Sequence, residues 1–159
     1  MISARERIRA VFPAADSGTS ADGIPFLRVV AMDMPEIAFL LRDQLGYGRF
    51  IDLTAVDDPS REDRFELQYL FYSLVEKGWL RIKTRTALEA PSLTAWFAAA
   101  DWFEREVFDM FGVRFVGHPD LKRILMPDEW PTYPLRRDEP VGGEPVDFVA
   151  TRDVHGNPP

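Results

Sequence analysis

Residues 50–86 read FIDLTAVDDPSREDRFELQYLFYSLVEKGWLRIKTRT. From Arg64 to Leu74, apolar residues alternate with polar ones, which is the period of a half-buried strand. A strand over Phe50–Val56 precedes this stretch, and a strand over Trp79–Thr86 follows it across a short turn that holds Gly78. These residues predict three strands, of which the last two pair with each other.

The residues before this region predict a short helix and a further strand. Ser3 and Glu6 have the spacing of a capping box, which begins a helix that runs to about Phe12. The stretch 13–23 is rich in small and polar residues and is expected to be a loop. Residues 26–31, FLRVVA, then predict a strand.

Capping boxes also begin two later helices. The pairs are Asp33 with Glu36 and Asp101 with Glu104, and Ser92 is an alternative cap for the second helix. These helices end at Gly46 and Gly112, since glycine favours the position after a helix. The element order α-β-α-β-β-β-α predicts an α+β fold, a two-layer α/β sandwich with a mixed sheet of about four to five strands. It leaves the strand order open.

Proline divides the chain into two parts, because eight of its 13 prolines follow residue 118. We expect residues 1–118 to form a compact α/β domain and residues 119–159 to form an extended Pro-rich tail that wraps a partner subunit. The tail contains residue types that carry interface energy: Trp130, Tyr133, Arg136 and Arg137. A tail folded back on its own domain explains the same residues.

The composition is that of one globular domain of 159 residues and 18.2 kDa. Its net charge of −7 argues against nucleic-acid binding, which depends on cationic side chains. The absence of cysteine excludes disulfides, thiolate metal sites and iron–sulfur ligation. There is no visible signal peptide and no apolar run of the roughly 18 residues that a membrane span needs. We therefore expect contact with a membrane only through a partner.

The sequence offers few groups for catalysis or cofactor binding. It has two histidines, and it lacks the glycine-rich loops of nucleotide sites and the nucleophile elbow of hydrolases. We expect no catalytic, cofactor-binding or metal-binding residues in this chain. A stand-alone enzyme that uses Glu104, Glu106 and His118 is the alternative. The two glutamates point to different sides of their helix, which favours a packed helix with an ion-paired outer face, including a pair between Arg105 and Asp109.

Residues 104–127, EREVFDMFGVRFVGHPDLKRILMP, closely resemble the signature of the thirty-kilodalton (C) subunit family of respiratory complex I, the NADH:quinone oxidoreductase. Downstream, Pro134-Leu135-Arg136-Arg137-Asp138 is similar to the family's P-L-R-K-D element, with Arg137 in place of the usual lysine. The resemblance is strong over about residues 92–138 and looser before them.

This resemblance implies that the chain binds partner subunits, more than that it catalyses a reaction. It implies a non-redox peripheral-arm subunit of the proton-translocating NADH:quinone oxidoreductase, on the cytoplasmic side of the cell membrane. It would dock the forty-nine-kilodalton (D) subunit and the neighbouring iron–sulfur subunits B and I. FMN, the iron–sulfur clusters, NADH and quinone would be bound by other subunits, and the isolated chain would have no activity. The equivalent subunit of a membrane-bound hydrogenase or F420-type dehydrogenase complex is an alternative.

The resemblance also implies which residues lock the fold and dock the partner. The residues that match its motifs are Glu104, Arg105, Glu106, Asp109, Gly112, Gly117, His118, Pro119, Asp120, Arg123, Pro134, Leu135, Arg136, Arg137 and Asp138. In this interpretation Gly112 and Gly117 permit turns, and residues 117–120 set the direction in which the chain leaves toward its partner.

Overall fold

The computed structural model describes residues 3–139. The helices are α1 (Ala4–Val11), α2 (Met34–Phe39) and α3 (Ala100–Phe111), with a 3-10 turn η1 (Ala31–Asp33) before α2 and a π-helical turn η2 (Leu40–Gln44) after it. The strands are β1 (Asp16–Thr19), β2 (Pro25–Val30), β3 (Arg49–Asp57), β4 (Phe65–Ser73), β5 (Gly78–Thr86), β6 (Glu89–Pro91) and β7 (Arg114–Val116). Of the predicted tail, residues 140–159 lie outside the described residues.

Five strands form one mixed sheet in the order β1-β2-β5-β4-β3. The neighbours β3, β4 and β5 are antiparallel, as are β1 and β2, whereas β2 and β5 run parallel. β6 and β7 form a separate two-stranded parallel ladder. The three strands predicted from residues 50–86 are confirmed, including the pairing of β4 with β5.

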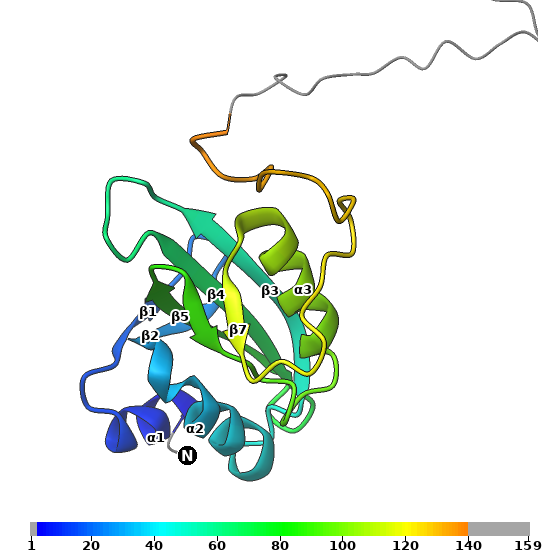
Figure 1. Ribbon diagram of the computed structural model, residues 1–159. Coiled ribbons are helices and arrows are strands. Elements are labelled where there is room, and N and C mark those ends of the chain that lie inside the picture. Colours follow the sequence, from blue (N-terminus) through cyan, green and yellow to red (C-terminus); the bar gives the residue numbers. More distant parts are fainter. Residues whose placement is uncertain (1–2, 140–159) are drawn as a thin grey trace, which may run out of the picture.

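One face of the sheet carries the core, because every second residue of the long strands is buried. Phe65, Leu67, Tyr69 and Phe71 of β4 are fully buried beneath apolar side chains of the helices. In Figure 1, α3 lies beside β3, and α1 and α2 lie together at the bottom of the view. The predicted α+β fold, with helices packed against a mixed sheet, is confirmed.

Two of the three predicted capping boxes are wrong. The box at Ser3 and Glu6 forms as predicted. Asp33 makes no capping hydrogen bond, because η1 leads directly into α2 and the chain is already helical there. Asp101 lies inside α3, which begins one residue earlier, and the Glu104 carboxylate is bonded elsewhere.

The short strands were also missed. β1 lies inside the predicted loop 13–23, and β6 and β7 have only three residues each. Strands of this length are too short to show a period of two. The helix ends were better predicted, since Gly46 and Gly112 both follow a helix with a positive φ, +73° and +76°.

After β7 the chain forms neither helix nor strand as far as residue 139. We call residues 119–139 the strap. In Figure 1 the strap (yellow to orange) passes along the outer side of α3. Its backbone and side chains bond to α3 and to the ends of β3 and β4. The described part of the predicted tail thus packs on its own domain, and contacts cross the expected boundary at residue 118.

Candidate docking site

Asp109 on α3 is the main attachment point of the strap. Its side chain is fully buried, and its Oδ2 accepts the backbone N–H groups of Ile124, Leu125 and Met126 at 3.0, 2.7 and 3.0 Å. Burial by itself would raise the pKa of Asp109, but these hydrogen bonds and the Arg123 guanidinium lower it below its usual value. The carboxylate is therefore charged at neutral pH and holds the strap against the helix.

Arg123 reinforces this attachment from the strap side. Its Nη1 lies 2.9 Å from Oδ1 of Asp109, and its Nη2 donates to the backbone carbonyls of Trp130 and Thr132, both at 3.1 Å. Its guanidinium also lies over the Tyr133 ring, 5.1 Å from the centroid. One side chain thus joins α3 to two backbone carbonyls of the strap.

The predicted ion pair between Arg105 and Asp109 is wrong. Arg105 instead donates from Nε to the Lys122 carbonyl at 3.2 Å and lies 3.9 Å from Asp101. Its guanidinium stacks over Trp102 at 4.8 Å. The helical spacing would allow the predicted pair, but Arg123 and three backbone amides occupy the Asp109 carboxylate.

Gly112 lets the strap approach the end of α3. A Cβ at this residue would overlap the Arg136 guanidinium and would lie 2.7 Å from the Tyr133 ring. Arg136 donates from Nε to the Phe111 carbonyl at 2.6 Å, and its guanidinium lies over Tyr133 at 4.4 Å. The Leu135 N–H donates to the Met110 carbonyl at 3.1 Å. Close packing, and not only the turn, therefore requires glycine here.

The strap's last described residues are bonded at the loop end of the β3–β4 hairpin. The Arg64 guanidinium forms bidentate pairs with Asp57 and with Asp138. The Arg137 N–H also donates to Asp57 at 2.8 Å. Arg64 lowers the pKa of Asp138 to about 2, and it is the largest cause that lowers the pKa of Asp57.

His118 forms the turn between β7 and the strap. Its ring nitrogen Nδ1 accepts the Asp120 N–H at 3.0 Å, so Nε2 carries the proton that can donate to the Asp101 carbonyl at 3.2 Å. Gly117 has φ +89° and faces open space, so it serves the turn alone. Pro119 and Asp120 are exposed, and Asp120 pairs with Lys122 at 2.7 Å.

Glu104 lies on the buried side of α3 and contacts the segment before that helix. Its Oε1 accepts the Leu93 N–H at 2.6 Å, whereas its Oε2 has no hydrogen-bond partner among the described residues. Burial raises the pKa of Glu104 to about 7. The nearby Tyr69 hydroxyl is also unpartnered in the described part of the chain, and burial and the Glu104 charge raise its pKa.

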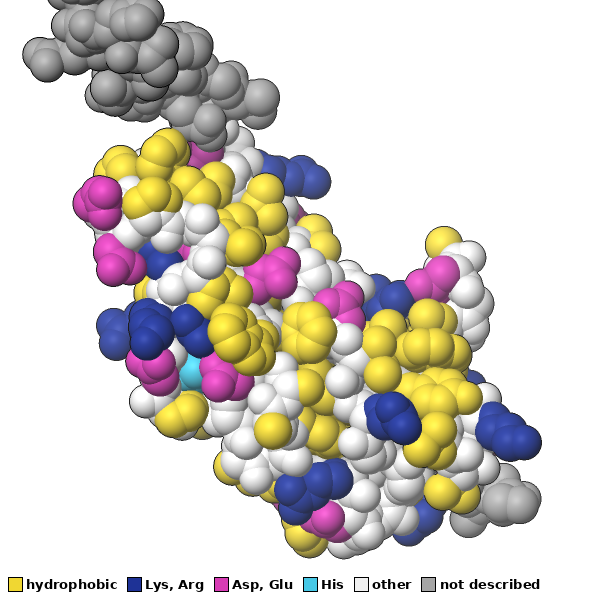
Figure 2. All heavy atoms as spheres, turned by 90° about the vertical axis from the view of Figure 1, so that its right-hand side faces the viewer, with side chains coloured by type: hydrophobic (Ala, Val, Ile, Leu, Met, Phe, Trp, Pro, Cys, Tyr) yellow, Lys and Arg dark blue, Asp and Glu magenta, His cyan; other side chains and the backbone are white. Residues whose placement is uncertain are grey.

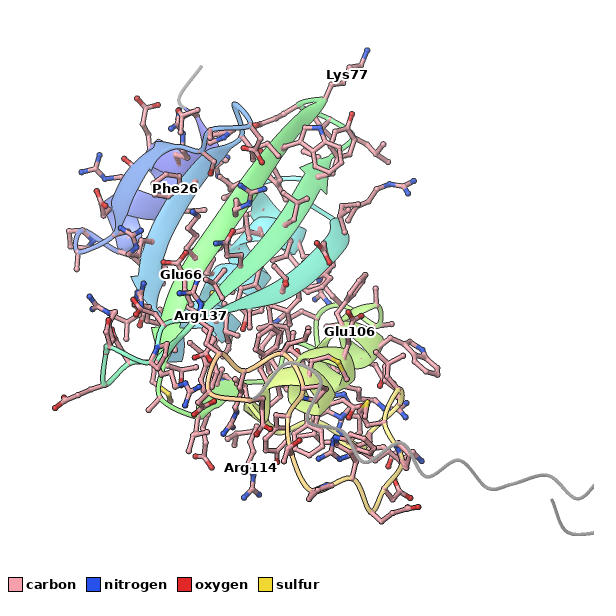
Figure 3. The ribbon with its side chains drawn as sticks, turned by 90° about the horizontal axis from the view of Figure 1, so that it is seen from above. Phe26, Glu66, Lys77, Glu106, Arg114 and Arg137 are labelled. Atoms are coloured by element: carbon pink, nitrogen blue, oxygen red, sulfur yellow. The ribbon has the colours of Figure 1, made fainter. Side chains whose placement is uncertain are left out.

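The alternative catalytic set does not assemble. Glu106 is exposed on α3, where Figure 3 labels it, whereas Glu104 is fully buried. His118 is bonded to Asp101 and Asp120 instead of to either glutamate. The different orientation of the two glutamates, predicted from helical spacing, is confirmed.

Four large apolar side chains of α3, β7 and the strap are exposed. Trp102, Val116, Leu125 and Leu135 are 62%, 62%, 61% and 55% exposed. Figure 2 shows hydrophobic side chains intermixed with acidic and basic ones over this face of the molecule. Such a mixture of aromatic, aliphatic and arginine side chains is typical of protein–protein interfaces. We call these four side chains the strap face.

Between residues 3 and 139 no helix is long and apolar enough to cross a bilayer. The same part of the chain holds no group of three or more histidine, aspartate or glutamate side chains arranged to bind a metal ion. The polar groups of the strap region are instead bonded to one another. This arrangement can hold a shape and bind a partner.

Sequence reasoning missed Asp57 and Arg64, which hold the end of the strap. They are seven residues apart, on either side of the loop that joins β3 to β4, a position at which strand pairing brings side chains together. Asp138 is 74 residues away from Arg64, so no local pattern indicates that contact.

The family model described as respiratory-chain NADH dehydrogenase, 30 Kd subunit, matches residues 27–145. The chain is 38% identical over 154 residues to the C subunit of NADH-quinone oxidoreductase from Roseiflexus sp. (strain RS-1), covering 93% of this chain and 88% of that protein. It is 44% identical over 119 residues to the protein of the same name in Sinorhizobium medicae (strain WSM419), of which it spans 57%.

Solved structures share the fold. A trypsin-resistant fragment of Nqo5 superposes with a TM-score of 0.61 at 23% identity, covering 74% of this chain and 97% of the fragment. A chain of the membrane-bound sulfane sulfur reductase, an archaeal respiratory membrane complex, superposes with a TM-score of 0.72 at 25% identity, covering 84% of this chain and 82% of that one.

Proposed function

Because this chain belongs to the family of the 30 kDa subunit of respiratory-chain NADH dehydrogenase, we propose that it is a non-redox, peripheral-arm subunit of a proton-translocating NADH:quinone oxidoreductase. Its role is to dock and stabilise the neighbouring subunits through which electrons pass from NADH to quinone. The observation that carries this proposal is the strap, which α3 holds in one conformation with apolar side chains turned outward.

The strap supports docking because it is fixed before any partner binds. Ion pairs and backbone hydrogen bonds hold it at Asp109, at Arg136 and at Arg64. A surface that is already ordered loses less conformational entropy on association than a loose segment does. The exposed side chains of the strap face then provide the apolar contacts.

In this proposal the redox cofactors belong to other subunits. The sequence has no cysteine for iron–sulfur ligation. Side chains such as Asp109 and His118 form hydrogen bonds within the chain. FMN, the iron–sulfur clusters, NADH and quinone are then held by partners, among them the forty-nine-kilodalton subunit and the iron–sulfur subunits B and I. The chain lies on the cytoplasmic side of the membrane and reaches it only through the complex.

The equivalent subunit of another membrane-bound respiratory complex is the second candidate. The likeness to a chain of the sulfane sulfur reductase complex supports it, because that chain is part of an archaeal respiratory membrane complex. The two candidates share the docking role and differ in the electron donor of the whole assembly.

Affinity purification of the tagged full chain from gently solubilised membranes tests the proposal. We expect an assembly that shows flavin and iron–sulfur absorption and reduces quinone with NADH. An assembly with iron–sulfur absorption but no NADH oxidation would favour the second candidate. Recovery of the free chain alone, with complex activity intact elsewhere in the extract, would contradict both.

A further inference from the structure

Three exposed carboxylates lie on the elements that carry the strap face. They are Glu106 on α3, which Figure 3 labels, and Asp128 and Glu129 on the strap. None of them forms an ion pair or a side-chain hydrogen bond with another of the residues 3–139. Figure 2 shows acidic side chains beside hydrophobic ones on this side of the molecule. We call these three side chains the acidic rim.

The turn 127–130 holds two members of the acidic rim against α3. A backbone hydrogen bond of 3.0 Å between its first and last residues closes the turn. The Arg123 guanidinium joins it to the helix, because it lies 3.1 Å from the Trp130 carbonyl and 2.9 Å from the Asp109 carboxylate. Glu106 precedes Asp109 by three residues, so the two lie on neighbouring turns of one side of α3. The strap thus brings its carboxylates toward the part of α3 that carries Glu106.

The cations closest to the acidic rim along the chain are occupied by other partners. Arg105 is buried and donates to the Lys122 carbonyl. The Lys122 ammonium pairs with Asp120 at 2.7 Å, and Arg123 pairs with Asp109. These side chains hold the strap in place and leave the acidic rim without a counter-charge in the described structure.

The region as a whole is negatively charged. Residues 101–139 contain nine acidic and six basic side chains, so their formal net charge is −3. Arg136 is bonded to the end of α3. Arg114 and Arg137 are exposed, but Figure 3 shows both of them away from Glu106. An acidic rim beside exposed apolar side chains is complementary to a partner that offers basic and apolar groups together.

We propose that the strap face binds a segment of a neighbouring subunit in which lysine or arginine side chains adjoin apolar ones. The apolar side chains of that segment contact the strap face, and its cations pair with the acidic rim. Opposite charges speed the encounter and exclude acidic segments, which the rim repels. This inference rests on the proposed function and adds the chemistry of the partner that docks there.

Photo-crosslinking in the assembled complex identifies the contacting segment. The residue p-benzoylphenylalanine replaces Leu125, or Trp102 in a second preparation, and the purified complex is illuminated. Mass spectrometry should find a peptide of another subunit with lysine or arginine close to apolar residues. An acidic or uncharged segment, residues 140–159 of the same chain, or no attachment from either position would overturn the inference while the proposed function stands. If the unsubstituted chain brings down no complex, the proposed function itself fails.

A competition experiment measures what the acidic rim contributes. Asp128→Lys/Glu129→Lys is co-expressed with the unsubstituted chain under a different tag, and the ratio of the two chains in the purified complex is compared with their ratio in the extract. We expect the variant to be depleted about tenfold, because two attractive contacts become repulsive.

Glu36→Lys/Glu62→Lys is the matched control, since it makes the same change of charge at exposed residues of α2 and the β3–β4 loop. It should enter the complex at the ratio found in the extract. Both double variants should keep the melting temperature of the unsubstituted chain, because surface substitutions of this kind change stability little. Equal incorporation of the two double variants would overturn the inference.

Discussion

Two buried carboxylates on α3 have opposite environments. Asp109 accepts three backbone N–H groups and an arginine, which lower its pKa. Glu104 accepts one N–H group, and burial raises its pKa to about 7. The difference follows from the number of donors, because burial alone disfavours both charges. Asp109 therefore acts as a fixed anion, whereas Glu104 exchanges its proton near neutral pH.

Replacing the Asp109 carboxylate should destabilise the protein strongly. In Asp109→Asn the amide can accept some of the backbone hydrogen bonds, but it leaves the Arg123 charge unpaired. We expect the free energy of unfolding, measured by urea denaturation, to fall by about 3 kcal/mol. Glu106→Gln removes the same charge at an exposed site of α3 and should change it by less than about 0.5 kcal/mol. Equal effects would show that the strap does not depend on Asp109.

Glu104 should make stability depend on pH. The folded protein holds this proton more tightly than the unfolded chain, whose glutamate has a pKa of 4.5. The contribution is thus complete below about pH 4.5 and is lost as the pH rises to about 7. We expect roughly 2–3 kcal/mol over this window, measured by urea denaturation at several pH values.

The Glu104→Gln variant provides the comparison, because glutamine keeps the shape and does not titrate. Its stability should vary less with pH between 4.5 and 7 than that of the unsubstituted chain. The lowered pKa values of Asp57, Asp109 and Asp138 affect stability only at lower pH, so they do not overlap this window. Parallel pH profiles would show that the Glu104 pKa is not raised.

At the scale of elements, the strap needs both a turn and a close approach at the end of α3. Gly112→Ala and Gly117→Ala both place an L residue at positive φ, which costs about 1 kcal/mol. At Gly112 the new methyl group also overlaps Tyr133 and Arg136, which should add about 1–3 kcal/mol. Thermal unfolding of the two variants measures this difference. Equal melting temperatures would contradict close packing of the strap.

Truncation tests whether the strap completes the fold. All helices and strands of the described structure precede residue 117, so a chain that ends at Leu125 should still fold. It loses the contacts of Arg136 and Asp138, which leaves Asp57 and the end of α3 more exposed. We expect native-like circular dichroism with a lower melting temperature than the full chain. An unfolded product would mean that the strap is part of the core.

The sequence predicts the long elements well and the contacts between distant elements poorly. The alternation in β4 reflects one buried face, so it is visible in the residues themselves. The Arg105–Asp109 pair was a sound local expectation, but Asp109 binds the strap instead. The Asp138–Arg64 pair depends on where the strap runs after α3. Whether a side chain binds a local or a distant partner therefore becomes visible only in the folded structure.

At the scale of the whole molecule, the proposed function depends on surfaces of the described structure. The strap face combines backbone held by hydrogen bonds with exposed apolar side chains. The chain belongs to a family of respiratory-chain NADH dehydrogenase subunits. In the proposed function, its contribution to the complex is its shape and its affinity for neighbouring subunits.

Assembly of the complex in cells tests this account most directly. Cells that lack the gene are complemented with the unsubstituted chain, with Leu125→Glu/Leu135→Glu, or with Leu74→Glu, which alters a leucine of similar exposure in the β4–β5 turn. The amount of assembled complex is measured by native gel electrophoresis with an NADH dehydrogenase stain. The account predicts that the strap variant folds but assembles several-fold less complex, and that Leu74→Glu assembles normally. Normal assembly of the strap variant would contradict it.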